Sequence, residues 1–182
     1  MRFGTVLLAT AAAFALWMEP QDAAKAAPAP EAAKADVESV DAIVKALYDT
    51  ISGPKGQKRD WNRLRSLFAT DARLRAVQTT KEKKVVVRTM SVEDYVKGAG
   101  PYLEEKGFFE KEVARKADRF GHVAHLFSTY ESRAKAEDAE PFARGINSIQ
   151  LLNDGERWWV TGINWDVESP DQKIPADYDA KK

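Results

Sequence analysis

His125 is the side chain in this sequence best suited to acid–base chemistry near neutral pH. It alternates with Val123, Phe127 and Thr129 in a strand-like segment. Residues two apart in a strand lie on the same face, so the spacing predicts a histidine on an apolar face. An unperturbed imidazole titrates at about pH 6.5, so His125 is a candidate general acid or base. The competing interpretation is a core histidine that bonds to a backbone or hydroxyl group.

Tryptophans supply the second candidate feature. The segment 144–168 reads as two strands joined by a turn at residues 153–156, and three of the five tryptophans lie on the second strand. Trp159, Thr161, Ile163 and Trp165 alternate onto one apolar face, which helices should cover. Aromatic side chains on such faces favour a small-molecule cavity. The predicted lining is Trp61, Tyr95, His125, Trp159 and Trp165.

The opposite faces of the same strands offer an alternative, polar-bottomed site. Polar residues inside a sheet need hydrogen-bond partners, and a single β-bulge is enough to exchange the two faces of a strand. The alternative site consists of Tyr130, Gln150, Asn164 and Asp166.

Neither a metal nor a cofactor is predicted. His122 and His125 are three positions apart and point to opposite faces of one strand. No cluster of His, Asp and Glu with metal-ligand spacing surrounds them.

Helices come early in the chain and strands come late. Asp36, Asp60 and Ser91 are expected to cap three helices, the third interrupted near Gly100-Pro101. This order predicts an α+β fold, with three helices packed in the concavity of a strongly bent antiparallel sheet, and a cone whose mouth is a pocket. The expected strands are 73–79, 85–89, 108–116, 122–133, 144–152 and 157–168.

The N-terminus has the pattern of a secretory signal peptide. Arg2 precedes an apolar run to Met18, and the small-x-small site Ala24-Lys25-Ala26 follows. We expect a signal peptide over 1–26, an Ala/Pro-rich tether over 27–35, the domain over 36–168 and a polar tail over 169–182. Ala33-Lys34-Ala35 is an alternative cleavage site. The run is shorter than a membrane-spanning helix needs, so no membrane span is expected after cleavage.

The chain has no cysteine. A lipid-anchored exported protein needs a cysteine at its cleavage site, so the expected location is the periplasm or the medium, without lipid and without disulfides.

Charge gives no reason to expect a nucleic-acid partner. The chain has 28 basic and 28 acidic residues, and the signal peptide removes two of each, namely Arg2, Lys25, Glu19 and Asp22. A balanced chain provides no electrostatic attraction to nucleic acid or anionic lipid.

The element order, the helix over 60–68 and the strand containing Gly155-Glu156-Arg157-Trp158-Trp159-Val160 resemble the nuclear transport factor 2-like (NTF2-like) superfamily. Within it the chain is similar to the SnoaL-like proteins, in particular a secreted branch, through 125–132 and 144–151. The resemblance covers 37–168 and implies a cone-shaped, cystatin-like fold. It implies no single activity, because the superfamily includes isomerases, cyclases, dehydratases, epoxide hydrolases and non-catalytic binding domains.

No enzyme pattern of the superfamily aligns as a complete set. The carboxylate, tyrosine and protonated aspartic acid of the isomerases cannot be matched. Asp166 could be one member of an epoxide-hydrolase arrangement, and His122, His125, Tyr95 and Tyr130 are the residue types of the dehydratase sites.

Three hypotheses follow from these residues. The first is an exported domain that binds a small apolar or aromatic molecule without catalysis. The second is a hydratase, isomerase or cyclase that uses His125. The third is an envelope assembly domain that acts through the outer sheet face, where a homodimer through the sheet is also expected. An enzyme needs His125 in an open cavity beside a second titratable group.

Overall fold

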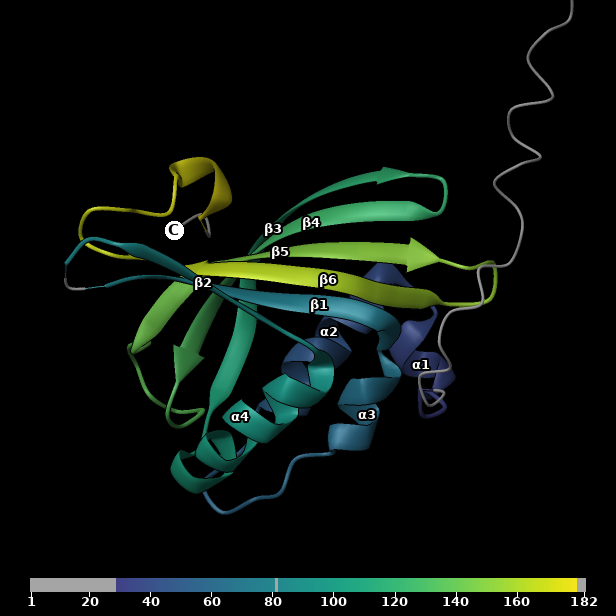
Figure 1. The fold of residues 1–182 in the computed structure, drawn as a ribbon, viewed down its shortest axis with the longest axis horizontal. Coiled ribbons are helices and arrows are strands. Elements are labelled where there is room, and N and C mark those ends of the chain that lie inside the picture. The colour runs from purple at the N-terminus through teal and green to yellow at the C-terminus, as the bar shows by residue number, and fades with distance from the viewer. Residues whose placement is uncertain (1–28, 81, 180–182) are drawn as a thin grey trace, which may run out of the picture.

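A computed structural model describes residues 29–80 and 82–179. The predicted signal peptide and the first two residues of the predicted tether lie outside these residues. The described chain forms four α-helices and one six-stranded sheet that arches over the helices (Figure 1). The cone-shaped α+β fold expected from the sequence is confirmed.

Side chains that accept hydrogen bonds from backbone amides cap three of the four described helices. α1 (Lys34–Val37) is short, and the Ser39 hydroxyl caps α2 (Val40–Ile51) by accepting from the Ala42 amide. Asp60 caps α3 (Trp61–Ser66), as predicted. The predicted cap at Asp36 is wrong: its carboxylate lies inside α1 and accepts two hydrogen bonds from Arg63 on α3.

The long helix α4 (Val92–Lys106) starts with the predicted capping box, in which Ser91 and Asp94 bond to each other's backbone amides. The expected interruption near Gly100-Pro101 is wrong. Pro101 lacks an amide for the carbonyl of Lys97, but Lys97 lies on the exposed side of the helix, where water can satisfy that carbonyl.

The sheet has the order β2-β1-β6-β5-β4-β3. β1 and β6 are parallel and every other neighbouring pair is antiparallel, so the sheet is mixed and the expectation of a wholly antiparallel sheet is corrected. The strands are β1 (Phe68–Thr79), β2 (Val85–Met90), β3 (Phe109–Phe120), β4 (Val123–Arg133), β5 (Ala143–Asn153) and β6 (Trp158–Val167).

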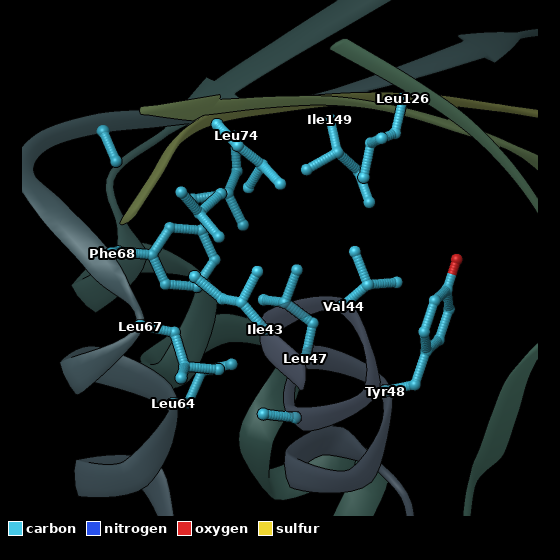
Figure 2. Packing of buried hydrophobic residues seen from close by; sticks show 14 of the residues in the cluster. Ile43, Val44, Leu47, Tyr48, Leu64, Leu67, Phe68, Leu74, Leu126 and Ile149 are labelled. Carbon is cyan, nitrogen blue, oxygen red and sulfur yellow. The ribbon is translucent and has the colours of Figure 1, made fainter. Parts of the chain in front are cut away.

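The core lies between the helices and the concave face of the sheet. Ile43, Val44 and Leu47 of α2 point toward Leu126 and Ile149 on the concave sheet face (Figure 2). All five are buried, and burying each such side chain contributes about 1.5–3 kcal/mol. Leu64, Leu67, Phe68 and Leu74 close the same cluster from α3 and β1.

A β-bulge in β6 decides which tryptophans face the helices. Gln150 of β5 pairs with Gly162 and Leu151 pairs with Val160, which leaves Thr161 without a partner. Before the bulge, Trp158 and Val160 are buried in the core, and after it Trp165 lies on the concave face. The bulge thus reverses the alternation of the strand between residues 160 and 163.

The outer sheet face carries the C-terminal segment. A 3₁₀ turn over Ala176–Tyr178 places the Tyr178 ring 5.5 Å from the Phe127 ring, and the Tyr178 carbonyl accepts from the Thr129 hydroxyl. Thr129 is consequently fully buried although it faces away from the helices. The predicted polar tail thus packs back on an apolar part of β4 through Tyr178.

Candidate functional site

A cavity of about 460 Å³ lies between α2, α4 and the concave face of the sheet. Most of its walls are apolar or aromatic. Tyr102 on α4 and Phe142 before β5 line it and are 58% and 61% exposed, so these two rings border its mouth. The deeper lining includes Leu47, Tyr48, Ile51, Leu64, Phe68, Leu74, Tyr95, Phe108, Glu110, Tyr130, Ser132, Asn147, Ile149, Ile163 and Trp165.

Glu110 on β3 is the acidic group of this cavity. Its backbone is fixed by Ser52, whose hydroxyl accepts from the Glu110 amide and also lies 3.1 Å from the Glu110 carbonyl oxygen. The Ser132 hydroxyl donates to Glu110 Oε2 at 2.8 Å. Burial raises the pKa of Glu110 to about 7, while hydrogen bonds from Ser132 and Asn147 act in the opposite direction. The carboxyl can therefore exchange a proton near neutral pH.

A chain of hydrogen bonds leads from this carboxyl to the protein surface. Asn147 donates to the Tyr48 hydroxyl at 3.1 Å, and the Tyr48 and Ser128 hydroxyls are 2.7 Å apart. Ser128 donates to Glu112, so it accepts the Tyr48 proton. The Tyr48 oxygen is thereby left as the acceptor for Asn147, which fixes the amide group beside Glu110.

The outer end of this chain is an ion-pair cluster. Arg115 donates twice to Glu112, at 2.8 and 2.6 Å, and once to Asp41 on α2 at 2.6 Å. Such bidentate pairs hold a carboxylate in one orientation. Glu112 is thus held where it can accept from Ser128.

Aromatic rings form much of the rest of the wall. Tyr95 on α4 meets Trp165 on β6 edge to face, with ring centroids 6.4 Å apart and planes at 86°. Tyr130 reaches the cavity beside Gly145, where a Cβ would stand 2.5 Å from the tyrosine oxygen, so a glycine is needed for this approach. Burial raises the pKa of the Tyr48, Tyr95 and Tyr130 hydroxyls, so all three stay protonated at neutral pH.

Of the five residues predicted to line one cavity, the structure brings two together. Tyr95 and Trp165 line it. His125 lies on the outer face, where its Nε2 is 3.1 Å from the Ser148 hydroxyl and its ring packs on Phe127. The prediction that Val123, His125, Phe127 and Thr129 face the helices is wrong, because Leu126, Ser128 and Tyr130 take that side of β4.

Trp159 lies on the outer face for a different reason. The bulge at Thr161 reverses the in–out alternation of side chains between Trp159 and Trp165, so the two tryptophans lie on opposite faces of the sheet. Its indole nitrogen donates to Asp154 at 2.6 Å, and the Arg157 guanidinium stacks 3.6 Å from its ring centre. The Trp159 side chain therefore packs against the β5–β6 turn.

Trp61 lies between two helices. Its indole nitrogen donates to Glu104 on α4 at 3.0 Å, and a Cβ at Gly100 would lie 3.1 Å from its ring. Trp61 joins α3 to α4 and does not reach the sheet side of the cavity. The prediction that Trp61 lines the cavity is therefore wrong.

The alternative polar set is divided in the same way. Tyr130 lines the cavity, whereas Gln150 pairs with His125 on the outer face and lines a second hollow of about 500 Å³ there. Asp166 accepts from Gln172 of the C-terminal segment, and Asn164, two residues before it, shares its side of β6. No residue of this set except Tyr130 reaches the cavity.

Sequence reasoning missed Glu110, Tyr48 and Asn147. Glu110 stands in a run of alternating charges, which reads as a solvated edge strand. Tyr48 extends the apolar face of its helix, and this position was the available signal that an aromatic hydroxyl enters the concavity.

No group of three His, Asp or Glu side chains within residues 29–80 and 82–179 could hold a metal ion. In the same residues no helix is long and apolar enough to cross a membrane.

Comparison with protein-family models and with curated proteins found no match. Among solved structures, the chain is similar to a protein of unknown function with a cystatin-like fold from Nostoc punctiforme, with TM-score 0.52 and 14% identity over 70% of this chain and 87% of that one. It is also similar to an NTF2-like protein of unknown function from Silicibacter pomeroyi (TM-score 0.49, 14% identity, 72% and 94% covered). A third is an NTF2-like protein of unknown function from Shewanella baltica (TM-score 0.44, 15% identity, 70% and 89% covered). The first of these likenesses shows that the chain has a cone-shaped, cystatin-like α+β fold.

Proposed function

We propose that this protein binds a small, largely apolar or aromatic molecule inside the cone, with a polar group of that molecule facing Glu110. The observation that carries the proposal is the cavity of about 460 Å³, in which the one carboxyl, that of Glu110, lies among mostly apolar and aromatic side chains. Ligand sites in proteins commonly have volumes of about 300–1,000 Å³ and a few convergent polar groups.

The polar groups of the cavity support this proposal because they converge on one wall. Glu110, Ser132, Asn147 and Tyr48 come from β3, β4, β5 and α2, and their side chains form one hydrogen-bonded set. Apolar side chains from α2, β1 and β6 stand around them. This polar wall would orient a ligand that has one polar end, and the apolar walls of the cavity would desolvate its apolar body.

The experiment is a fluorescence titration with N-phenyl-1-naphthylamine, a neutral apolar probe. Three proteins are compared: the unchanged chain, Ala99→Phe, which fills the cavity from α4, and His125→Ala on the outer face. We expect the unchanged chain and His125→Ala to bind the probe equally and Ala99→Phe to lose at least about tenfold in affinity, or 1.4 kcal/mol. Equal binding by all three proteins, or binding lost in His125→Ala, would contradict the proposal.

Acid–base catalysis in the same cavity is a second candidate function, with Glu110 in place of His125. The observation that favours it is a carboxyl whose pKa burial raises to about 7, which is suited to accept a proton at neutral pH. The test is deuterium incorporation next to the carbonyl of 1-tetralone in D₂O, followed by NMR. Exchange no faster with the unchanged protein than with Glu110→Gln would rule this candidate out for ketones.

We also propose that the protein is exported and cleaved near Ala26. The support is Arg2, the apolar run to Met18 and the small-x-small site at residues 24–26. N-terminal sequencing of the exported protein should begin near Ala27. Intact Met1 in a membrane pellet would contradict this.

A further inference from the structure

The cavity has an acidic group and no basic one. Among the lining residues, all within the described part of the chain, Glu110 is the only one with a carboxyl, ammonium, guanidinium or imidazole group. The nearest cation of its hydrogen-bonded network is Arg115, which is held by Glu112 and Asp41 at the far end. An anionic ligand would therefore meet a carboxyl with no compensating cation, which is unfavourable in a desolvated site.

Aromatic rings surround the space that faces this carboxyl. Tyr48 comes from α2, Tyr95 from α4, Tyr130 from β4 and Trp165 from β6, and all four line the same cavity. Phe108 lines it as well, next to Phe142 at the mouth, with ring centroids 6.2 Å apart. The faces of aromatic rings attract cations, and several rings around one space are the usual recognition site for quaternary ammonium groups.

We propose that the ligand is an organic cation, an amine or quaternary ammonium group on an apolar body, held by these rings and by the carboxylate of Glu110. The inference rests on the function proposed above and specifies its ligand class. The aromatic wall would accept any apolar molecule, but a carboxyl without a basic partner complements a cation. The ammonium group supplies the positive partner that the Glu110 carboxylate lacks. The faces of the aromatic rings replace part of the hydration of the ammonium group.

The pH dependence follows from the groups that face Glu110. These are Tyr48 of α2, Tyr95 of α4, Ser132 and Tyr130 of β4, and Asn147 of β5. Burial raises the pKa of all three tyrosines, so they stay neutral at pH 6–8, and the serine and asparagine carry no charge. Glu110 is the group of this set that titrates in that range, and a cation binds its ionised form.

The experiment compares two probes of the same shape and different charge. Benzyltrimethylammonium is permanently cationic, and neopentylbenzene replaces its nitrogen with carbon. Each is titrated against protein that already holds N-phenyl-1-naphthylamine, and displacement of the fluorescent probe is measured at pH 6, 7 and 8. The ammonium group itself does not titrate, so any pH dependence belongs to the protein.

We expect benzyltrimethylammonium to bind at least about tenfold more tightly than neopentylbenzene at pH 8. Its affinity should rise about tenfold from pH 6 to pH 8 as Glu110 ionises, while that of neopentylbenzene stays nearly constant. Glu110→Gln should remove both the preference and its pH dependence. Glu105→Gln, on the exposed side of α4, is the matched control and should keep them.

The outcomes separate the two proposals. If N-phenyl-1-naphthylamine itself does not bind in the cavity, the proposed function fails. If it binds but is displaced equally well by both probes, or better by neopentylbenzene, the ligand-class inference is overturned and the pocket stands. Cation affinity that falls from pH 6 to pH 8 also overturns the inference, since it would mean that the ionised carboxylate of Glu110 does not attract the cation. The pH series uses the unchanged chain and does not depend on Glu110→Gln folding.

Discussion

Ser132 Oγ donates a 2.8 Å hydrogen bond to Glu110 Oε2 across the β3–β4 pair, inside the cavity. The bond stabilises the ionised carboxyl, while burial favours the protonated one. The Glu110 carboxyl thus has a pKa near neutral pH, and several measurements can test this.

The pH dependence of stability is the first prediction. Burial raises the pKa of Glu110 from 4.5 to about 7. Below pH 4.5 both the folded and unfolded states hold the proton, and between 4.5 and 7 the unfolded state releases it first. Glu110 therefore costs stability as pH rises through this window, up to about 3 kcal/mol above pH 7.

Glu110→Gln removes this cost. Relative to the unchanged protein, the variant should be about 2–3 kcal/mol more stable at pH 8 than it is at pH 4.5, measured by urea unfolding at both pH values. Glu105→Gln, on the exposed side of α4, should show no such pH-dependent gain in the free energy of unfolding. A difference between Glu110→Gln and the unchanged protein that is the same at both pH values would mean that Glu110 is solvated.

The second prediction concerns the Ser132 hydroxyl. Ser132→Ala removes a donor to the ionised carboxyl, so the pKa of Glu110 should rise by about one unit. The measurement is the carboxyl ¹³C chemical shift of Glu110 against pH. Ser148→Ala on the outer face, which removes the bond to His125, is the matched control and should leave the titration unchanged. If the titration midpoint of Glu110 is unaltered in Ser132→Ala, the Ser132 hydroxyl does not affect the protonation of Glu110.

The adjacent tryptophans of β6 provide a third prediction. Trp158 is 3% exposed and lies in the core, whereas Trp159 faces outward beside Arg157. Trp158→Ala should cost about 3–5 kcal/mol of unfolding free energy, and Trp159→Ala less than about 1.5 kcal/mol, measured by chemical denaturation. A larger loss of stability from Trp159→Ala than from Trp158→Ala would contradict the bulge at Thr161, because Trp159 would then be the buried side chain.

Arg59 organises the connection between α2 and α3. It is 7% exposed, and its guanidinium donates to the carbonyls of Ile51, Gly53 and Leu103 at 2.5–3.2 Å, which ties the end of α2 to α4. Arg59→Ala should lower the free energy of unfolding by about 3 kcal/mol or more, because several carbonyls lose a charged donor. Arg75→Ala, on exposed β1, is the control and should change it by less than about 0.5 kcal/mol. Equal effects of the two substitutions would show that the carbonyl contacts of Arg59 add nothing.

The fold could be predicted from the sequence because its signals are local. Ser91 and Asp60 cap helices where their residue types indicate, and the hairpin turn at residues 153–156 joins β5 and β6. The parallel pairing of β1 with β6 could not be predicted, since it joins strands about ninety positions apart and leaves no local pattern.

The site could be predicted only in part because apolar side chains lie on both faces of the sheet. The face with His125 and Phe127 reads as the more apolar one, but the C-terminal Tyr178 covers it. The face toward the helices contains Ser128, whose hydroxyl bonds to Tyr48 and Glu112. The alternation of residue types shows which side chains share a face of a strand. Which of the two faces points toward the helices depends on the elements that pack against the sheet.

The central claim is that a small molecule binds inside the cone, and intermolecular nuclear Overhauser effects test it most directly. The protein is methyl-labelled and saturated with N-phenyl-1-naphthylamine. We predict contacts from the probe to the methyl groups of Ile149 and Ile163 in the cavity, and none to Val123 and Leu152 in the outer hollow. Contacts to Val123 and Leu152 alone would contradict the account, because the binding site would then be the outer sheet face.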